Sequence, residues 1–123
     1  MKIGLESTAS EVVTANNTAA TLGSGFLDVY ATPAMVALME KAASSAVQSA
    51  IPATESTVGI SLNIKHIAAT PLGQTVTAKA TLIAIDGKKL TFEVVATDEQ
   101  KTIGTGTHER FIINVEKFLS KIQ

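Results

Sequence analysis

The sequence predicts an α+β fold in which an antiparallel sheet wraps around one long central helix. A single long helical pattern begins near Thr32 and ends before Pro52, and four strand-like segments separated by turn signals follow it without a second helix. Strands joined by hairpins pair antiparallel and bury one face, so they need a helix to cover that face. At 123 residues the chain fits one domain, residues 1–123, with one core.

The amino-acid composition argues against several classes of partner and of site. The chain has 10 basic and 11 acidic residues and no basic stripe, so we do not expect nucleic acid as a partner. It has no cysteine and two histidines, which excludes a thiolate nucleophile and argues against a dedicated metal site. We find no signal-like leader and no apolar run of bilayer length, so we expect a cytoplasmic protein without a membrane partner. A hydrophobic fraction of 46% and a mean hydropathy of +0.28 favour a chain that hides surface in a second subunit.

One strand and one irregular segment are predicted before the helix. Residues 3–14 alternate only in part between apolar and polar, and Asn16 and Asn17 end this strand. Residues 23–31 are punctuated by glycine and mix polar and apolar types. Such a segment can move over a site, so we expect a lid there.

The helix is predicted to run from Thr32 to about Ala50. Thr32 suits the N-cap, Pro33 suits the first helical position, and Pro52 follows the expected end. The apolar face gathers Met35, Val36, Met39, Ala43, Ala46, Val47 and Ala50. Many of these residues are alanine, so the helix can approach a sheet closely.

Four strands are predicted after the helix, over about residues 57–68, 74–85, 89–98 and 102–115. Residues 70–73 form the first turn, and Asp86 with Gly87 is a strong hairpin signal. The two middle strands alternate apolar residues with threonine and charged residues, which is typical of half-buried antiparallel strands.

His66 is the most informative candidate for chemistry. Ile60, Leu62, Ile64 and His66 occupy alternate positions of a predicted strand, so we expect them to share its apolar face. A buried imidazole needs a partner for each ring nitrogen, and its ordinary pKa of about 6.5 suits proton transfer at neutral pH. The alternative interpretation is a core histidine bonded to a backbone carbonyl.

Two polar residues of the helix are candidates for the partners of His66. Glu40 lies at the margin of the apolar face. It is either a carboxylate partly removed from water, which would need a cation or donor beside it to stay charged, or a boundary residue whose side chain reaches water. Thr32 is either a plain N-cap or a reactive hydroxyl. The two stand about 12 Å apart along the helix axis, so we expect His66 to bridge them. His108 is the competing imidazole, but the polar run around it favours solvent exposure.

Gly59 and Arg110 are further candidates. Gly59 lets a backbone N–H approach a ligand, although glycine is also ordinary at the start of a strand. Arg110 suits pairing with a phosphate or carboxylate, and an exposed surface arginine is the alternative.

Three segments carry a resemblance to a known family. They are "ATPAMVALMEKA", "GISLNIKHIAATPLGQTVT" and "GTGTHERFIINVEKF", which together resemble the hotdog-fold acyl-CoA thioesterases, specifically the fluoroacetyl-CoA thioesterase-like group. The resemblance extends from about residue 30 to residue 118. It implies that Thr32, Glu40 and His66 form the catalytic set. It also implies that Gly59 helps to place the acyl group and that Arg110 lines the site.

The same resemblance implies how the substrate is enclosed and what reaction occurs. The fluoroacetate-specialised enzyme closes its pocket with aromatic residues in the segment ahead of the threonine. In the corresponding segment of this chain Phe26 is the only phenylalanine, so the resemblance implies that Phe26 binds substrate. The implied reaction is hydrolysis of a short-chain acyl-CoA thioester, with coenzyme A as part of the substrate and no metal or other cofactor. The implied assembly is a homodimer joined through its sheet edges, or a dimer of dimers.

Two other functions remain open on the sequence alone. One is a non-catalytic hotdog dimer that binds acyl-CoA, and the other is a hotdog acyl-CoA hydratase or dehydratase.

Overall fold

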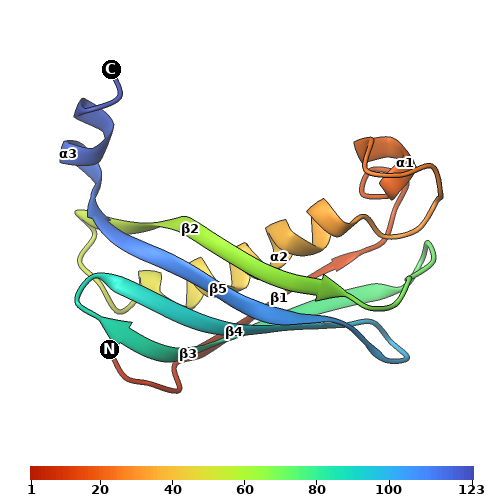
Figure 1. Ribbon diagram of the computed structural model, residues 1–123, viewed down its shortest axis with the longest axis horizontal. Coiled ribbons are helices and arrows are strands. Elements are labelled where there is room, and N and C mark those ends of the chain that lie inside the picture. Colours follow the sequence, from red (N-terminus) through yellow and green to blue (C-terminus); the bar gives the residue numbers. More distant parts are fainter.

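The computed structural model describes residues 1–123 and contains five strands and three helices (Figure 1). In chain order they are β1 (Glu6–Val12), α1 (Ala19–Leu22), α2 (Thr32–Gln48), β2 (Glu55–His66), β3 (Thr75–Asp86), β4 (Lys89–Thr97), β5 (Thr102–Asn114) and α3 (Val115–Ser120). The strands form one antiparallel sheet in the order β1-β3-β4-β5-β2. None of the helices combines the length and the apolar character that crossing a bilayer requires.

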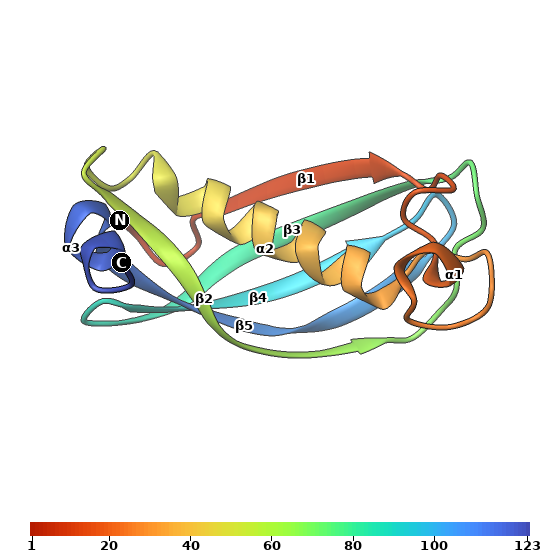
Figure 2. The ribbon, with the colours of Figure 1, turned by 90° about the horizontal axis from the view of Figure 1, so that it is seen from above.

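The helix α2 lies against one face of the sheet, between its two edge strands β1 and β2 (Figure 2). Its buried residues are Ala34, Met35, Leu38, Met39, Ala42, Ala43, Ala46 and Val47. They meet the alternating apolar residues of β3 and β4, which are fully buried from Val76 to Leu82 and from Leu90 to Ala96 at every second position. The predicted α+β fold, a sheet around one long central helix, is confirmed.

The start of α2 differs from the prediction. Thr32 is the first helical residue, Ala31 is the N-cap, and no side chain caps the helix. The N-cap prediction for Thr32 is wrong because its hydroxyl lies 2.7 Å from Nδ1 of His66 instead. The helix also ends at Gln48, two residues before the expected Ala50. Ser49 is the C-cap, and the N–H of Ala50 donates to the Val47 carbonyl at 2.9 Å in a tighter last turn.

A β-bulge interrupts the alternation of β2. Gly59 lies opposite Arg110 of β5 and Ser61 lies opposite Glu109, so Ile60 is an extra residue in the ladder. Ile60 is 51% exposed, and the prediction that it shares a face with His66 is wrong. The bulge shifts the pleat by one residue. Gly59 therefore faces α2 before the bulge, and Leu62, Ile64 and His66 are half-buried after it.

The two short helices were not predicted. Thr18 caps α1 by accepting from the N–H of Thr21, and Asn114 caps α3 by accepting from the N–H of Lys117. The α1 turn lies just ahead of the expected lid, residues 23–31. This segment contains no helix or strand, and Val29 and Tyr30 form isolated β-bridges. Figure 1 shows that α1 and α3 lie at opposite ends of the molecule.

Candidate active site

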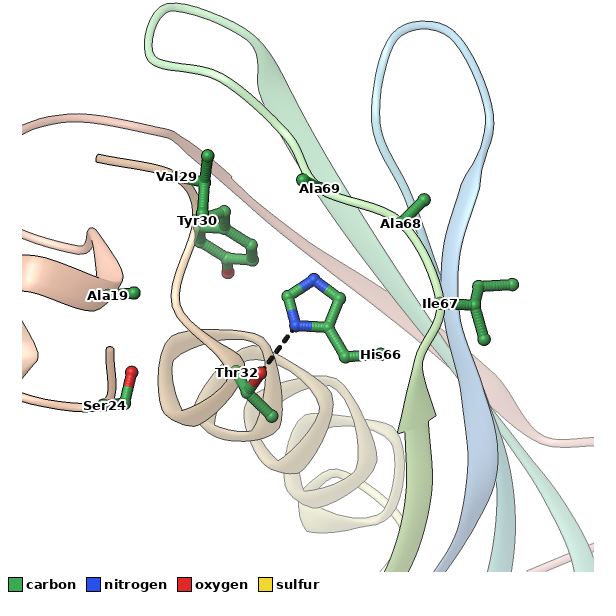
Figure 3. A pocket seen from close by; sticks show the side chains of 9 residues that line it. All are labelled: Ala19, Ser24, Val29, Tyr30, Thr32, His66, Ile67, Ala68 and Ala69. Carbon is green, nitrogen blue, oxygen red and sulfur yellow. Dashed lines mark hydrogen bonds between the residues drawn. The ribbon is translucent and has the colours of Figure 1, made fainter. Parts of the chain in front are cut away.

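A cavity of about 320 Å³ opens beside the first turn of α2 (Figure 3). It is enclosed by the start of α2, by the residues at and after the end of β2, and by α1 with the loop that follows it. The lining residues are Ala19, Ser24, Val29, Tyr30, Thr32, His66, Ile67, Ala68 and Ala69. Six of the nine lining residues are hydrophobic, which suits an acyl group, and Thr32 with His66 supplies polar atoms in its wall.

Thr32 and His66 form one hydrogen-bonded pair. Thr32 Oγ1 lies 2.7 Å from His66 Nδ1, as the dashed line of Figure 3 marks. The other ring nitrogen, Nε2, is buried and has no hydrogen-bond partner in this chain. Burial lowers the pKa of His66 from its ordinary value. The imidazole is therefore neutral at pH 7 and can accept a proton from the threonine side.

Glu40 does not bind His66, so the predicted bridge between Thr32 and Glu40 is wrong within one chain. The Glu40 carboxylate accepts from Arg110 Nη1 at 3.4 Å, and its side chain is 42% exposed. The reason is the position of His66 at the last residue of β2, beside the first turn of α2. Glu40 lies two turns further along α2, opposite Gly59.

A second polar group surrounds Glu40, and we call Glu40, Thr57, Gly59, His108 and Arg110 the Glu40 cluster. The buried guanidinium of Arg110 donates from Nε to Thr57 Oγ1 at 2.8 Å and from Nη2 to the Thr57 carbonyl at 3.0 Å. Burial lowers the pKa of Arg110, while the charge and hydrogen bond of Glu40 oppose that shift. Arg110 is thus a buried cation held by two strands and one carboxylate.

His108 is buried, so its expected exposure is wrong. Its Nδ1 donates to the Ser61 carbonyl at 2.8 Å, and Nε2 lies 3.2 Å from Arg110 Nη1. The polar run that suggested exposure belongs to an interior strand, where His108 and Arg110 point inward and Glu109 points outward. Burial lowers the pKa of His108.

Gly59 is required where it stands. A Cβ at this position would lie 2.7 Å from Glu40 Oε2 and 3.2 Å from His108 Cε1. The missing side chain is what lets the carboxylate lie against β2. Phe26, by contrast, is 99% exposed and does not line the cavity of this chain.

Tyr30 is a lining residue that sequence reasoning missed. Its ring is buried beside the cavity, and its hydroxyl donates to Glu11 Oε2 of the loop-side end of β1 at 2.5 Å. Burial, and then Glu11, raise the pKa of Tyr30. A lone tyrosine two residues before Thr32 was the available signal, since a buried phenol fixes the backbone that leads into α2.

Comparisons with known proteins agree on one family. A model of the family described as fluoroacetyl-CoA-specific thioesterase matches residues 13–116. A fluoroacetyl-CoA thioesterase from Streptantibioticus cattleyicolor is 42% identical over 98 residues, which cover 80% of this chain and 70% of that protein.

Two solved structures are similar over nearly the whole chain. One is a variant of a fluoroacetyl-CoA-specific thioesterase crystallised with fluoroacetate and CoA, with a TM-score of 0.90, 37% identity, and coverage of 96% of this chain and 99% of that chain. The other is a hot-dog-like protein from Thermanaerovibrio acidaminovorans, which is 21% identical with a TM-score of 0.90 and covers 99% of this chain and 90% of that chain. The latter shows a shared fold. The residues that the family model matches include every candidate site residue named above.

Proposed function

The chain belongs to the fluoroacetyl-CoA-specific thioesterase family and is an acyl-CoA thioester hydrolase, and we propose that Thr32 and His66 carry out the hydrolysis. The observation that carries this proposal is the 2.7 Å contact between Thr32 Oγ1 and His66 Nδ1 in the wall of an apolar cavity. A hydroxyl beside a neutral imidazole is the arrangement that nucleophilic acyl transfer requires.

In this mechanism His66 takes a proton from the attacking oxygen, which belongs to Thr32 or to a water that Thr32 holds. That oxygen bonds to the thioester carbonyl carbon, and the carbon–sulfur bond breaks. The departing CoA sulfur then receives the proton from His66. Where Thr32 is the attacking residue, a water that gives its proton to His66 next attacks the threonine ester. The ester C–O bond breaks, the acid leaves, and the Thr32 oxygen takes the proton back from His66. The uncapped N–H groups at the start of α2 stabilise the negative charge on the carbonyl oxygen, because the positive end of the helix dipole lies there.

The substrate is a short-chain acyl-CoA, with coenzyme A as part of the substrate and no metal or other cofactor. The hydrophobic residues in the lining of the cavity support an acyl group beside Thr32 and His66. We place the reaction in the cytoplasm, where CoA thioesters are made and used.

The working unit is a homodimer in which Glu40 of the partner subunit binds the free Nε2 of His66. Two features support this assembly. β2 is an edge strand with one side unpaired, and the exposed Ile60 and Ile67 lie on or beside it. A buried Nε2 without a partner is also costly in a lone chain, and a carboxylate there would fix the tautomer that leaves Nδ1 free to accept.

Strand pairing explains how the two chains complete each other. If two copies of β2 pair antiparallel about an axis near Asn63, His66 lies opposite Ile60 of the partner subunit, three residues on the other side of the axis. That position is the bulge next to Gly59, where the carboxylate of Glu40 lies. Each site then combines Thr32 and His66 of one protomer with the Glu40 cluster of the other.

Thiol release from acetyl-CoA and longer acyl-CoAs tests the catalytic pair. We expect His66→Ala to lower kcat by about a hundredfold or more, because the proton carrier is lost. Thr32→Val should lower kcat similarly, whereas Thr32→Ser keeps the hydroxyl and should retain most activity. Full activity in His66→Ala would overturn the assignment.

Mixing two inactive variants tests the shared site. A heterodimer of His66→Ala and Glu40→Ala contains one intact site and one doubly substituted site, so an equimolar mixture should recover about a quarter of the parental activity. If both residues act within one protomer, the mixture stays inactive.

A further inference from the structure

A buried histidine of β5 has no part in the proposed hydrolysis, although it belongs to the Glu40 cluster. His108 is 1% exposed, and the centroid of its ring lies 6.4 Å from that of the Phe92 ring. Both of its ring nitrogens are hydrogen-bonded within the chain. Such a residue either stabilises the core alone or also sets the position of a group that acts in the reaction.

One ring nitrogen anchors the imidazole to the neighbouring strand. His108 Nδ1 donates to the Ser61 carbonyl at 2.8 Å, and Ser61 directly follows the bulge residue Ile60 of β2. A carbonyl only accepts, so this bond places the ring proton on Nδ1 and leaves Nε2 as an acceptor. Burial also lowers the pKa of His108, which keeps the lone pair of Nε2 available at pH 7.

The other ring nitrogen meets the Arg110 guanidinium. Arg110 Nη1 lies 3.2 Å from His108 Nε2 and 3.4 Å from Glu40 Oε2. Nη1 carries two hydrogens, so it can donate to the imidazole and to the carboxylate at the same time. Thr57 holds the other two nitrogens of the guanidinium. The partly exposed carboxylate therefore binds a buried cation whose orientation other residues fix.

The imidazole, the guanidinium and the carboxylate also pack against one backbone position of β2. A Cβ at Gly59 would lie 3.2 Å from His108 Cε1 and 3.3 Å from Arg110 Nη1. The Glu40 carboxylate lies closer still, with Oε2 at 2.7 Å from the same point. Movement of one of these groups therefore displaces the others.

We propose that His108 is a positioning residue that holds Glu40 in its catalytic place through Arg110, an inference that rests on the proposed function. Three hydrogen bonds besides the one to Glu40 fix the guanidinium, and His108 accepts one of them. Without this acceptor an N–H of Arg110 would be buried and unpaired, so the guanidinium would turn toward another acceptor. The carboxylate would move with it, away from Nε2 of His66 of the partner subunit.

Two substitutions of similar shape separate the roles of the two ring nitrogens. In His108→Asn the amide nitrogen can replace Nδ1 as donor to Ser61, but no atom reaches the position of Nε2. In His108→Gln the amide oxygen reaches that position and accepts from Arg110. Each variant loses one buried hydrogen bond, so the two melting temperatures should fall by similar amounts.

The kcat values should differ where the stabilities do not. For acetyl-CoA we expect kcat to fall about tenfold in His108→Asn and to stay within about threefold of the parent in His108→Gln. KM should change little in both, because the lining of the catalytic cavity is intact. Equal kcat in the two variants would overturn the proposal, because a purely structural role does not distinguish the two amides.

A substitution at Glu40 shows whether His108 acts through the carboxylate. In a Glu40→Gln background, His108→Asn should lower kcat no further, because the carboxylate that it positions is already gone. A second loss of about tenfold would overturn the proposal. A parental kcat in Glu40→Gln alone would refute the role of Glu40 in the proposed function. A low kcat in Glu40→Gln beside a parental kcat in His108→Asn would refute only the role of His108.

Nitrogen NMR of the histidine rings tests the arrangement without hydrolysis. The chain has two histidines, so the spectrum of His66→Ala assigns the signals of His108. We expect His108 in the parent to carry its proton on Nδ1 at pH 7, with Nε2 as a hydrogen-bonded acceptor. A proton on Nε2 at pH 7 would remove the acceptor for Arg110 and refute the proposal, whatever the activity of the protein.

Discussion

The two imidazoles of this chain are both inward-facing, yet their hydrogen bonds divide them into different roles. His108 Nδ1 donates to a backbone carbonyl, so Nε2 is the acceptor that faces Arg110, and both nitrogens are occupied. His66 uses one nitrogen for Thr32 and keeps the other unbonded. The groups beside the accepting nitrogens separate the two roles: the Thr32 hydroxyl can give its proton to His66, whereas the Arg110 guanidinium beside His108 stays protonated.

The pH dependence of hydrolysis follows from the lowered pKa of His66. The neutral imidazole is the active form, so kcat/KM should fall as the pH decreases through the pKa of His66. Burial lowers that pKa, and the proposed carboxylate of the partner subunit would raise it, so the acid limb itself, and not its midpoint, identifies the base. A pH–rate profile of the parent should show this limb, and His66→Ala should abolish it. A profile without an acid limb would contradict the role of His66 as base.

Gly59→Ala should impair catalysis and lower stability. The new Cβ would displace the flexible end of Glu40 and press on the buried His108 and Arg110 side chains, at 3.2 and 3.3 Å, so the melting temperature should fall. The displaced carboxylate should lower kcat by about tenfold or more. The parent is the reference, because Gly25, another glycine whose Cβ would find room, lies next to Ser24 and against Ala19 of the catalytic cavity. A kcat equal to that of the parent would show that the position of Glu40 is unimportant.

The sequence predicted where individual candidate side chains lie better than which of them lie together. Alternation correctly placed His66 against the helix, and helix geometry correctly separated Thr32 from Glu40. Alternation gives a face, but it does not reveal a bulge that changes the face within one strand, as Ile60 does. Residue spacing within one chain also gives no information on whether the Glu40 that the proposed site needs belongs to the same protomer or to its partner.

Among the elements, the β2–β5 ladder does most to position the site, since it carries His66, Gly59 and Arg110. Its close approach depends on Gly106. A Cβ there would overlap the carbonyl oxygen of Asn63 and lie 2.6 Å from Ile64 Cα, and neither backbone atom can yield easily.

Gly106→Ala should therefore destabilise the fold by about 3 kcal/mol, since the backbone of β2 must shift. Gly104→Ala is a useful comparison, because its Cβ would meet the Met35 side chain, whose flexible thioether can move. Denaturant unfolding should show the larger loss for Gly106→Ala. A larger loss for Gly104→Ala would mean that helix packing, and not the ladder, limits stability here.

Long elements were predictable and short ones were not. The α2 segment and the Asp86–Gly87 hairpin were found because periodicity and turn chemistry agree over many residues. The α1 and α3 helices have four and six residues, too few for a periodic signal. Their capping residues, Thr18 and Asn114, were the only local indication.

For the molecule as a whole, the unpaired side of β2 is the surface on which the proposed dimer depends. Ile60→Asp places a charge on this edge and should produce monomers, because a carboxylate would lose its water where the partner strand covers the edge. Activity should fall at least about tenfold, since neither protomer alone completes a site. Ile3→Asp is the control, because Ile3 is similarly exposed but lies outside β2. Sedimentation velocity checks the assembly, and an active Ile60→Asp monomer would refute a shared site.

The bulge at Ile60 affects the angle at which two copies of β2 would meet. On each side of Ile60 the residues of β2 keep consecutive partners on β5, so deleting this one residue would leave the ladder in register. The same protomer would fold around a straighter edge. Two copies with straighter edges would meet at another angle, and the distance between His66 and Glu40 of the partner subunit would change with it. An insertion or deletion at this point can therefore change the catalytic rate of the proposed dimer without altering a core residue.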